Sequence, residues 1–294
     1  MSSTRRLTLG FVGAGTVGCV LASAFDRAGY PVVAVASRSP ESARALAGRL
    51  TVPASVCNPQ GVCDRAELVF LTVSDDAIAD VAASIVWREG RAVVHCNGAS
   101  SIDPLSPAQR AGADVGVFHP LRSIPTADVS PVDLEGTPIG LEASSDSLRK
   151  TLESLARSVG GVPFVVRGNK TIYHASAVIA SNYLVALLDA AAGLWEHLGM
   201  AKGEGLRALL PLVRGTVDNL DRVGVPDALT GPIARGDVGT VTRHLEALTS
   251  VAPEVVTMYK EMGRATIRTA VAKGTLPEDM AEHIRHVLDA DGEA

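Results

Sequence analysis

Residues 7–18 read LTLGFVGAGTVG, a short apolar run that ends in three glycines at positions 13, 15 and 18. Such a run is typical of a buried strand, and residues 19–28 read as the helix that follows it. In the spacing G-x-G-x-x-G, Gly13 permits a tight turn, Gly15 lets the backbone approach a pyrophosphate, and Gly18 lets the helix pack close to the strand. The positive end of that helix then attracts phosphate groups. The stretch therefore predicts a dinucleotide-binding strand–turn–helix unit.

A second apolar strand is predicted at residues 31–37, and the residues at its end bear on the choice of dinucleotide. In units that bind NAD, a carboxylate about 20 residues beyond the glycines holds the ribose hydroxyls. Here that place reads Ser37-Arg38-Ser39, and a guanidinium matches a phosphate bidentately. The alternative is an arginine in a solvated loop, which we would prefer only without the glycine motif. The pattern favours NADP over NAD as the cofactor.

Three further apolar runs, residues 68–73, 92–96 and 115–118, read as buried strands that end in polar side chains. In an open α/β sheet, ligands lie beyond the carboxyl ends of the strands. Asn97 and His119 are therefore expected near a nicotinamide ring, although His119 can equally be a hydrogen-bonded structural histidine. The residues that we expect to contact the cofactor are Gly13, Ala14, Gly15, Thr16, Val17, Gly18, Ser37, Arg38, Ser39, Thr72, Val73, Ser74 and Asn97.

The alternation of strands and helices continues to about residue 167, with strands predicted at residues 137–141 and 162–166. Helical periodicity then replaces it. The sequence predicts an α/β fold: a doubly wound, mostly parallel sheet over residues 1–167, followed by an all-helical domain over residues 168–294.

Composition excludes several classes of protein. The chain has 294 residues, of which 47% are hydrophobic and 20% charged, enough for a sizeable core. Its net charge of -5 offers no overall attraction to nucleic acid or to an anionic membrane. Residues 175–195 are long enough to span a bilayer, but polar residues interrupt them, so we expect a buried domain helix. Four cysteines without zinc spacing are typical of a reducing cytoplasm and predict no metal site.

A long helix is predicted at residues 171–198, and its polar residues lie on one side. At about 100° per residue, His174 and Ser181 align almost directly, and Asn182 lies within a quarter turn of His174. Lys170 comes one turn before His174. Polar groups on an apolar helix need partners or a function, so these residues are either satisfied core residues or candidates for catalysis and substrate binding.

The helical half of the chain is interrupted at residues 229–237, which read LTGPIARGD. This loop could place Thr230 or Arg235 against an anionic substrate, because a guanidinium binds carboxylates and phosphates. The alternative is an exposed turn between two helices. The sequence leaves both interpretations open.

Three motifs resemble those of a family of Rossmann-like NADP oxidoreductases with a C-terminal domain of unknown function. They are YHASAVIASNYL at residues 173–184, LTGPIARGD at residues 229–237, and His119-Pro120. Over nearly its whole length the chain also resembles the wider group of oxidoreductases around 6-phosphogluconate dehydrogenase. That resemblance implies an NADP-binding Rossmann domain, a helical domain for substrate binding and dimerisation, and a homodimer.

Ketopantoate reductase is a more distant resemblance. Its Asn-Gly after the fifth strand is similar to Asn97-Gly98, and its central helix has a catalytic Lys followed by Asn four and eight residues later. With Asn182 as the second of those asparagines, His174 stands in the place of the lysine and Val178 in that of the first asparagine.

These resemblances imply an NADP(H)-dependent oxidoreductase that transfers a hydride to the C=O or C=N of a small carboxylate-bearing metabolite. The catalytic candidates are His174 as proton donor, Asn182 to orient the substrate, Asn97 beside the nicotinamide, and Lys170 as a reserve acid. The substrate-binding candidates are His119, Ser181, Thr230 and Arg235. The alternatives are an imine reductase similar to pyrroline-5-carboxylate reductase and a non-catalytic NADP-binding regulator.

Overall fold

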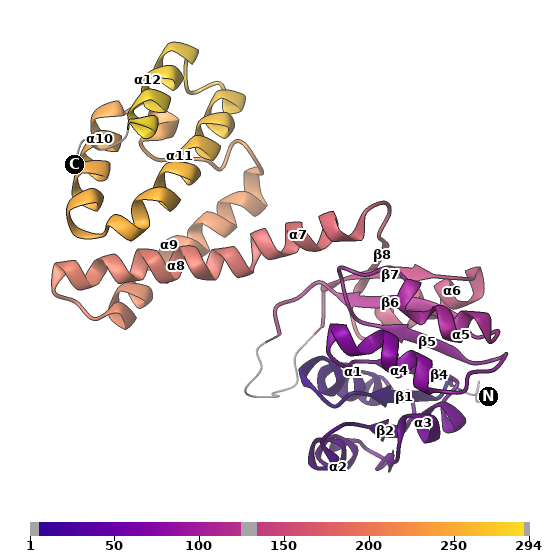
Figure 1. Cartoon of the computed structure of the whole chain (residues 1–294). Helices are drawn as coiled ribbons and strands as arrows, with labels where there is room; N and C mark the ends of the chain where they lie inside the picture. The colour runs from indigo at the N-terminus through magenta and orange to yellow at the C-terminus, as the bar shows by residue number, and fades with distance from the viewer. Residues whose placement is uncertain (1–5, 125–133, 291–294) are drawn as a thin grey trace. The chain divides into compact units, whose positions relative to one another are not determined.

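The computed structural model describes residues 6–124 and 134–290, which form two compact units (Figure 1). Unit 1 is Met1–Ser181 and contains the sheet, whereas unit 2 is Asn182–Ala294 and is helical. The division lies at Ser181, beyond the change of sequence character near residue 167, because the helix that begins at Lys170 is tied to the sheet.

Unit 1 is built around one eight-stranded sheet with the order β3-β2-β1-β4-β5-β6-β7-β8. Neighbouring strands run parallel except β6 and β7, which pair antiparallel. The predicted doubly wound, mostly parallel sheet is confirmed. The strands are β1 (Leu9–Val12), β2 (Val32–Ala36), β3 (Ser55–Val56), β4 (Leu68–Leu71), β5 (Ala92–His95), β6 (Asp114–Pro120), β7 (Pro138–Ala143) and β8 (Val162–Val165).

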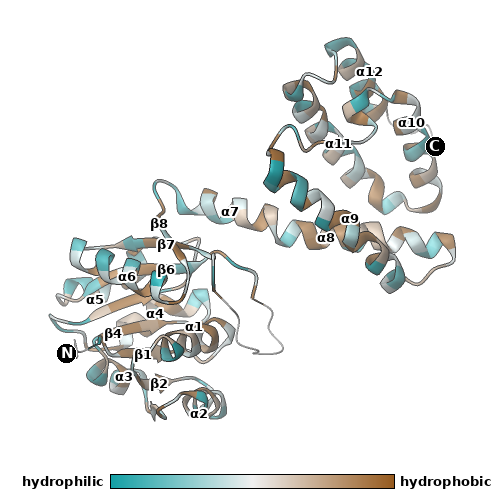
Figure 2. Ribbon diagram, turned by 180° about the vertical axis from the view of Figure 1, so that it is seen from behind, coloured by the Kyte–Doolittle hydropathy of each residue, from teal (hydrophilic) through white to brown (hydrophobic). Residues whose placement is uncertain are grey.

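The central strands are continuous apolar runs because helices cover both faces of the sheet (Figure 2). Helices α1, α2 and α6 cover the face that carries Phe11 and Phe70, whose ring centroids lie 5.0 Å apart. Helices α3, α4 and α5 cover the other face, against Val69 and Leu71. The helices of unit 1 are α1 (Thr16–Arg27), α2 (Pro40–Arg49), α3 (Pro59–Arg65), η1 (Asp75–Ala77), α4 (Ile78–Ser84), η2 (Asp103–Leu105), α5 (Ser106–Arg110), α6 (Asp146–Ser158) and α7 (Lys170–Ala180).

Unit 2 is helical and covers most of the helical region predicted at residues 168–294. Its buried core joins η4, α10, α11 and α12 through residues such as Ile233, Val241, Ile267 and Ile284. Helix α8 packs against α9. The elements are α8 (Asn182–Gly193), η3 (Leu194–Leu198), α9 (Lys202–Val223), η4 (Ile233–Arg235), α10 (Val238–Val251), α11 (Pro253–Lys273) and α12 (Glu278–Asp289).

The long helix predicted at residues 171–198 is divided into α7, α8 and η3, with Ser181 between the first two. By length and composition alone, the stretch Lys170–Leu198 could cross a membrane, yet only 6% of its most apolar window is buried. The expectation of a buried domain helix is therefore wrong for the single chain. Apolar side chains such as Tyr183 and Val185 remain exposed instead.

Candidate active site

The backbone where β1 meets α1 requires two of the three glycines of the G-x-G-x-x-G motif. Gly13 has a φ of 113°, which favours glycine, and a Cβ there would overlap the Thr72 carbonyl. A Cβ at Gly18 would overlap the Gly13 carbonyl oxygen, so α1 packs directly on the turn. Gly15 is the exposed N-cap of α1, and a Cβ there would have no atom within 4 Å. The N-terminus of α1 therefore opens onto free space, where an anionic group can approach it.

A cavity of about 640 Å³ extends from this turn to the end of β2. Gly13, Ala14 and Gly15 line one part of it, and Ser37, Arg38 and Ser39 line another. Its volume lies within the range of about 300–1,000 Å³ that is usual for small-molecule sites. Arg38 is exposed, and the Ser39 hydroxyl accepts the Ser42 N–H at 3.2 Å as the N-cap of α2. A guanidinium and hydroxyl groups thus share a cavity with the glycine turn.

A second cavity of about 200 Å³ adjoins the first at the end of β4. Both are lined by Thr72, Val73 and Ser74, and the smaller one also contacts Thr16, Val17 and Asn97. The Thr72 hydroxyl donates a hydrogen bond to the Gly13 carbonyl at 2.7 Å, so it also holds the glycine turn. The shared wall connects the Arg38 end of the larger cavity with Asn97.

The loop after β5 is held in place by the buried imidazole of His95. Its Nδ1 accepts the Asn97 N–H at 3.2 Å, and its Nε2–H donates to the Ser101 carbonyl at 2.8 Å. Burial lowers the pKa of His95, which favours this neutral tautomer. The Asn97 Oδ1 accepts the N–H groups of Ala99 and Ser100 at 2.6 and 3.3 Å. The donor end of the Asn97 amide is therefore the part suited to bind a ligand.

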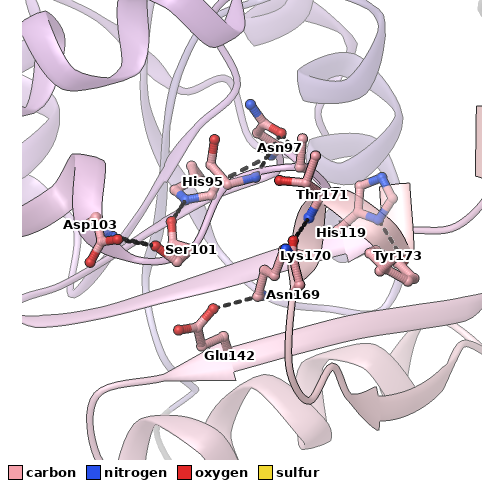
Figure 3. Close-up of polar contacts among 12 residues, drawn as sticks. His95, Asn97, Ser101, Asp103, His119, Glu142, Asn169, Lys170, Thr171 and Tyr173 are labelled. Carbon is pink, nitrogen blue, oxygen red and sulfur yellow. Dashed lines mark hydrogen bonds and ion pairs between the residues drawn. The ribbon is translucent and has the colours of Figure 1, made fainter. Parts of the chain in front are cut away.

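His119, near the end of β6, forms a hydrogen bond with a residue of α7. Its Nδ1 lies 2.8 Å from the Tyr173 hydroxyl, and the two rings are nearly perpendicular (Figure 3). The imidazole also lies directly over the Gly98 backbone, where an added Cβ would come within 2.7 Å of Nε2. Burial, reinforced by the charges of His174, Lys170 and His95, lowers the pKa of His119 to about 4.

Lys170 begins α7 and forms an ion pair with Glu142 of β7. Its Nζ lies 2.7 Å from the Glu142 Oε2, and the lysine side chain is only 8% exposed (Figure 3). The pair fixes the start of α7 to the sheet. Lys170 is thus engaged in an ion pair, which makes it a weaker candidate for a reserve acid. His174 follows one turn later, partly buried and near enough to His119 to affect its pKa.

Unit 1 brings together four of the predicted catalytic and substrate-binding residues: Asn97, His119, Lys170 and His174. The others lie at the end of unit 1 or in unit 2. Ser181 ends unit 1, and Asn182 opens α8. Thr230 is exposed on a loop whose carbonyl groups at Asp227 and Leu229 accept hydrogen bonds from Lys273, both at 2.8 Å, and Arg235 is exposed at the end of η4.

Three residues of this cluster escaped sequence analysis. His95 was read as part of an apolar strand, and Glu142 follows the apolar strand predicted at residues 137–141. Tyr173 precedes His174 in a recognised motif, but an aromatic residue at a helix start is ordinarily part of the core. Only the adjacency of β5, β6 and β7 with α7 brings these side chains together. Among the described residues, no group of three or more His, Cys, Asp or Glu side chains could hold a metal ion.

Two domain types account for most of the chain. Residues 2–120 match a Rossmann-like domain, and residues 137–266 match the domain of unknown function DUF2520. The chain thus combines a Rossmann-like domain with a C-terminal DUF2520 domain. The DUF2520 match begins just before β7. Glu142, Lys170, Tyr173 and His174 therefore belong to it, although they pack within unit 1.

The structure is similar to solved structures of oxidoreductases. BF3122 from Bacteroides fragilis, assigned as an NADP oxidoreductase, is 26% identical, with a TM-score of 0.74 over 90% of this chain and 98% of that one. The 1-pyrroline-5-carboxylate reductase of Streptococcus pyogenes is 17% identical, with a TM-score of 0.63 over 90% and 98%. The reductive aminase of Aspergillus terreus, solved with NADPH and ethyl levulinate, is 15% identical, with a TM-score of 0.64 over 96% and 99%. A search of the curated proteins finds no match.

Proposed function

We propose that this protein is an NADP(H)-dependent oxidoreductase that reduces the C=O or C=N group of a small carboxylate-bearing metabolite. The observation that carries the proposal is the pair of adjoining cavities, which connects Arg38 with Asn97 along the carboxyl ends of the strands. His119, Tyr173 and His174 gather beyond the Asn97 end. The similarity to a structure assigned as an NADP oxidoreductase supports the same class.

The residues of unit 1 fit NADP(H) as the cofactor. Gly15 leaves open space before the N-terminus of α1, where the phosphates would be held, and Arg38 is placed for the 2′-phosphate. The donor end of the Asn97 amide suits the nicotinamide carboxamide. When bound, NADPH supplies the hydride. The chain itself binds and orients the reactants and supplies a proton.

His174 is the residue that we propose as the proton donor, since an imidazole is the side chain that most often serves as a general acid. The proton would go to the oxygen or nitrogen of the reduced group. Asn182 would orient that atom, as the likeness to ketopantoate reductase implies. Ser181, Thr230 and Arg235 would bind the rest of the substrate, with the Arg235 guanidinium suited to a carboxylate.

The cofactor assignment is tested by titrating the protein with NADPH and with NADH. We expect a clear preference for NADPH, because the Arg38 guanidinium is placed to pair with the 2′-phosphate. Arg38→Ala should weaken NADPH binding by about 10-fold to 100-fold, which corresponds to losing a charged hydrogen bond of about 1.5–3 kcal/mol. Binding of NADH should be unchanged. Arg44→Ala is the control, because it removes a second arginine that lies in α2. It should alter neither affinity. Equal affinities for the two dinucleotides in the wild type would contradict the assignment.

An imine reductase is the second candidate. The fold similarity to the pyrroline-5-carboxylate reductase and to the reductive aminase, whose names concern C=N chemistry, favours it over a keto-acid specificity similar to that of ketopantoate reductase. A panel of keto acids and cyclic imines, followed by NADPH absorbance, separates the two. A non-catalytic NADP-binding regulator would bind NADPH tightly but would oxidise it neither with the keto acids nor with the cyclic imines.

We further propose a homodimer formed by unit 2. Within this unit, Val185 of α8 and Leu212 of α9 are 68% and 67% exposed, and an apolar cavity of about 590 Å³ lies among α8, α9, α10 and α11. Exposed apolar surface of this extent usually marks an interface. We expect a dimer by light scattering at micromolar concentration, and a monomer for Leu212→Glu. Val52→Glu, at a comparably exposed valine of unit 1, should remain dimeric. A monomeric wild type would contradict the proposal.

A further inference from the structure

The hydrogen bond between His119 and Tyr173 bears on which nitrogen of the His119 imidazole carries the proton. Burial raises the pKa of Tyr173, so its hydroxyl stays protonated at neutral pH. The only hydrogen-bond partner of this hydroxyl among the described residues is His119 Nδ1, at 2.8 Å. If the imidazole donated instead, the phenol proton would have no acceptor among the described residues. The favoured arrangement is therefore donation from Tyr173 to Nδ1, which leaves the imidazole proton on Nε2.

The surroundings of His119 favour the neutral ring. His174 and Lys170 of α7 lie near it, and a positive charge on either opposes protonation of His119. Glu142 is the nearby carboxylate, and its Oε2 lies 2.7 Å from Lys170 Nζ. With burial added, His119 is a neutral imidazole throughout the physiological range of pH.

The Cε1–Nε2 edge of the ring lies beside the segment that follows β5, next to the proposed reaction site. It lies over the Gly98 backbone, immediately after Asn97, which lines the smaller cavity. Gly98 permits this approach, because a Cβ would come within 2.7 Å of Nε2. No described residue accepts a hydrogen bond from Nε2, and this nitrogen is not among the fully buried atoms without a partner. Nε2 is therefore a donor that is left without a protein partner among the described residues.

We infer that His119 is a fixed neutral donor whose Nε2–H binds the oxygen or nitrogen of the group being reduced, while Tyr173 positions the ring through Nδ1. The inference rests on the proposed reductase function and adds a residue that polarises the substrate. A neutral N–H aimed at an atom that gains negative charge stabilises the transition state more than the ground state. In this arrangement His119 keeps its proton, and His174 delivers the one that is transferred.

The tautomer is tested without turnover, by NMR of the full-length protein with ¹⁵N-labelled histidine. His119→Gln identifies the His119 signals among those of the 7 histidines. We expect a neutral ring with the proton on Nε2 from about pH 5.5 to 8, with or without NADP⁺, because the depressed pKa lies below this range. In Tyr173→Phe, the signals should shift toward a mixture of tautomers. A cationic ring at pH 6, or a wild type protonated on Nδ1, would overturn the inference.

The donor role is tested by kinetics on whichever substrate the panel identifies. His119→Leu should lower kcat by about 100-fold to 1,000-fold, as removal of one such donor does elsewhere. His119→Gln places an amide donor near the position of Nε2 and should recover part of kcat, whereas His119→Asn places it near Nδ1 and should not. Tyr173→Phe should lower kcat with little change in the KM for NADPH. Equal activities for the Gln, Asn and Leu variants would refute the donor role.

The two proposals fail in different ways. If the wild type neither binds NADPH nor oxidises it with any substrate, the reductase function fails, and the donor role fails with it. If the wild type reduces a substrate while His119 is cationic, carries its proton on Nδ1 or is dispensable, only the inference about His119 fails.

Discussion

Gly13→Ala should abolish NADPH binding and destabilise unit 1 at the same time. The backbone at this position has a φ of 113°, and a new methyl group would overlap the Thr72 carbonyl. Such a conformation costs a non-glycine residue about 1–3 kcal/mol, and overpacking adds about 1–3 kcal/mol. We expect a lower free energy of unfolding in urea and a Kd for NADPH raised by more than about 100-fold, or about 2.7 kcal/mol.

Gly15→Ala is the matched variant that separates folding from binding. The Gly15 backbone has a φ of -80°, and an added Cβ has no atom within 4 Å, so stability should not change. The methyl group would nevertheless occupy the space through which a pyrophosphate approaches α1, so NADPH binding should be lost. Gly48→Ala in α2, where the space is also open, should affect neither property adversely. Normal NADPH affinity in Gly15→Ala would remove the glycine turn from the binding site.

His174→Ala should nearly abolish turnover while leaving the affinity for NADPH unchanged. A positioned general acid contributes about 10²-fold to 10⁴-fold to the rate, and kcat should fall by that factor. The cofactor cavities are lined by the ends of β1 and β4 and by the segments that follow the first five strands, with no contribution from α7. Fluorescence titration with NADPH and steady-state kinetics on the identified substrate measure the two properties separately.

His197→Ala is the control for this variant, because His197 lies on η3 in unit 2 and is not one of the residues of the cluster in unit 1. It should retain wild-type kcat. Full activity in His174→Ala would exclude His174 as the proton donor. The choice would then pass to Lys170, which would have to leave its ion pair with Glu142 in order to act.

The sheet could be predicted from sequence because its signals are local. Apolar runs such as residues 68–73 are buried on both faces, and the glycine turn carries its own conformational requirement at Gly13. The position of Arg38 beside that turn could also be predicted, since the strand that ends at Ala36 pairs in parallel with β1. Periodicity likewise predicted the helical half of the chain.

The remaining members of the cluster beyond Asn97, namely His95, Glu142 and Tyr173, could not be predicted because their places depend on tertiary pairing. His95 and His119 lie on adjacent strands, but Glu142 enters through an antiparallel strand whose register no short pattern specifies. The exposure of the stretch Lys170–Leu198 was missed for a related reason. Hydropathy shows that one face of a helix is apolar, but it does not show whether other residues of the same chain bury that face.

The ion pair between Lys170 and Glu142 holds the start of α7 on the sheet, so the cofactor cavities and the cluster of Asn97, His119, Lys170 and His174 lie together in residues 1–181. The candidates for recognising the rest of the substrate, Thr230 and Arg235, are exposed residues of the helical unit. In the proposed reductase, substitutions at these two positions can therefore alter substrate preference without changing any residue that lines the cofactor cavities.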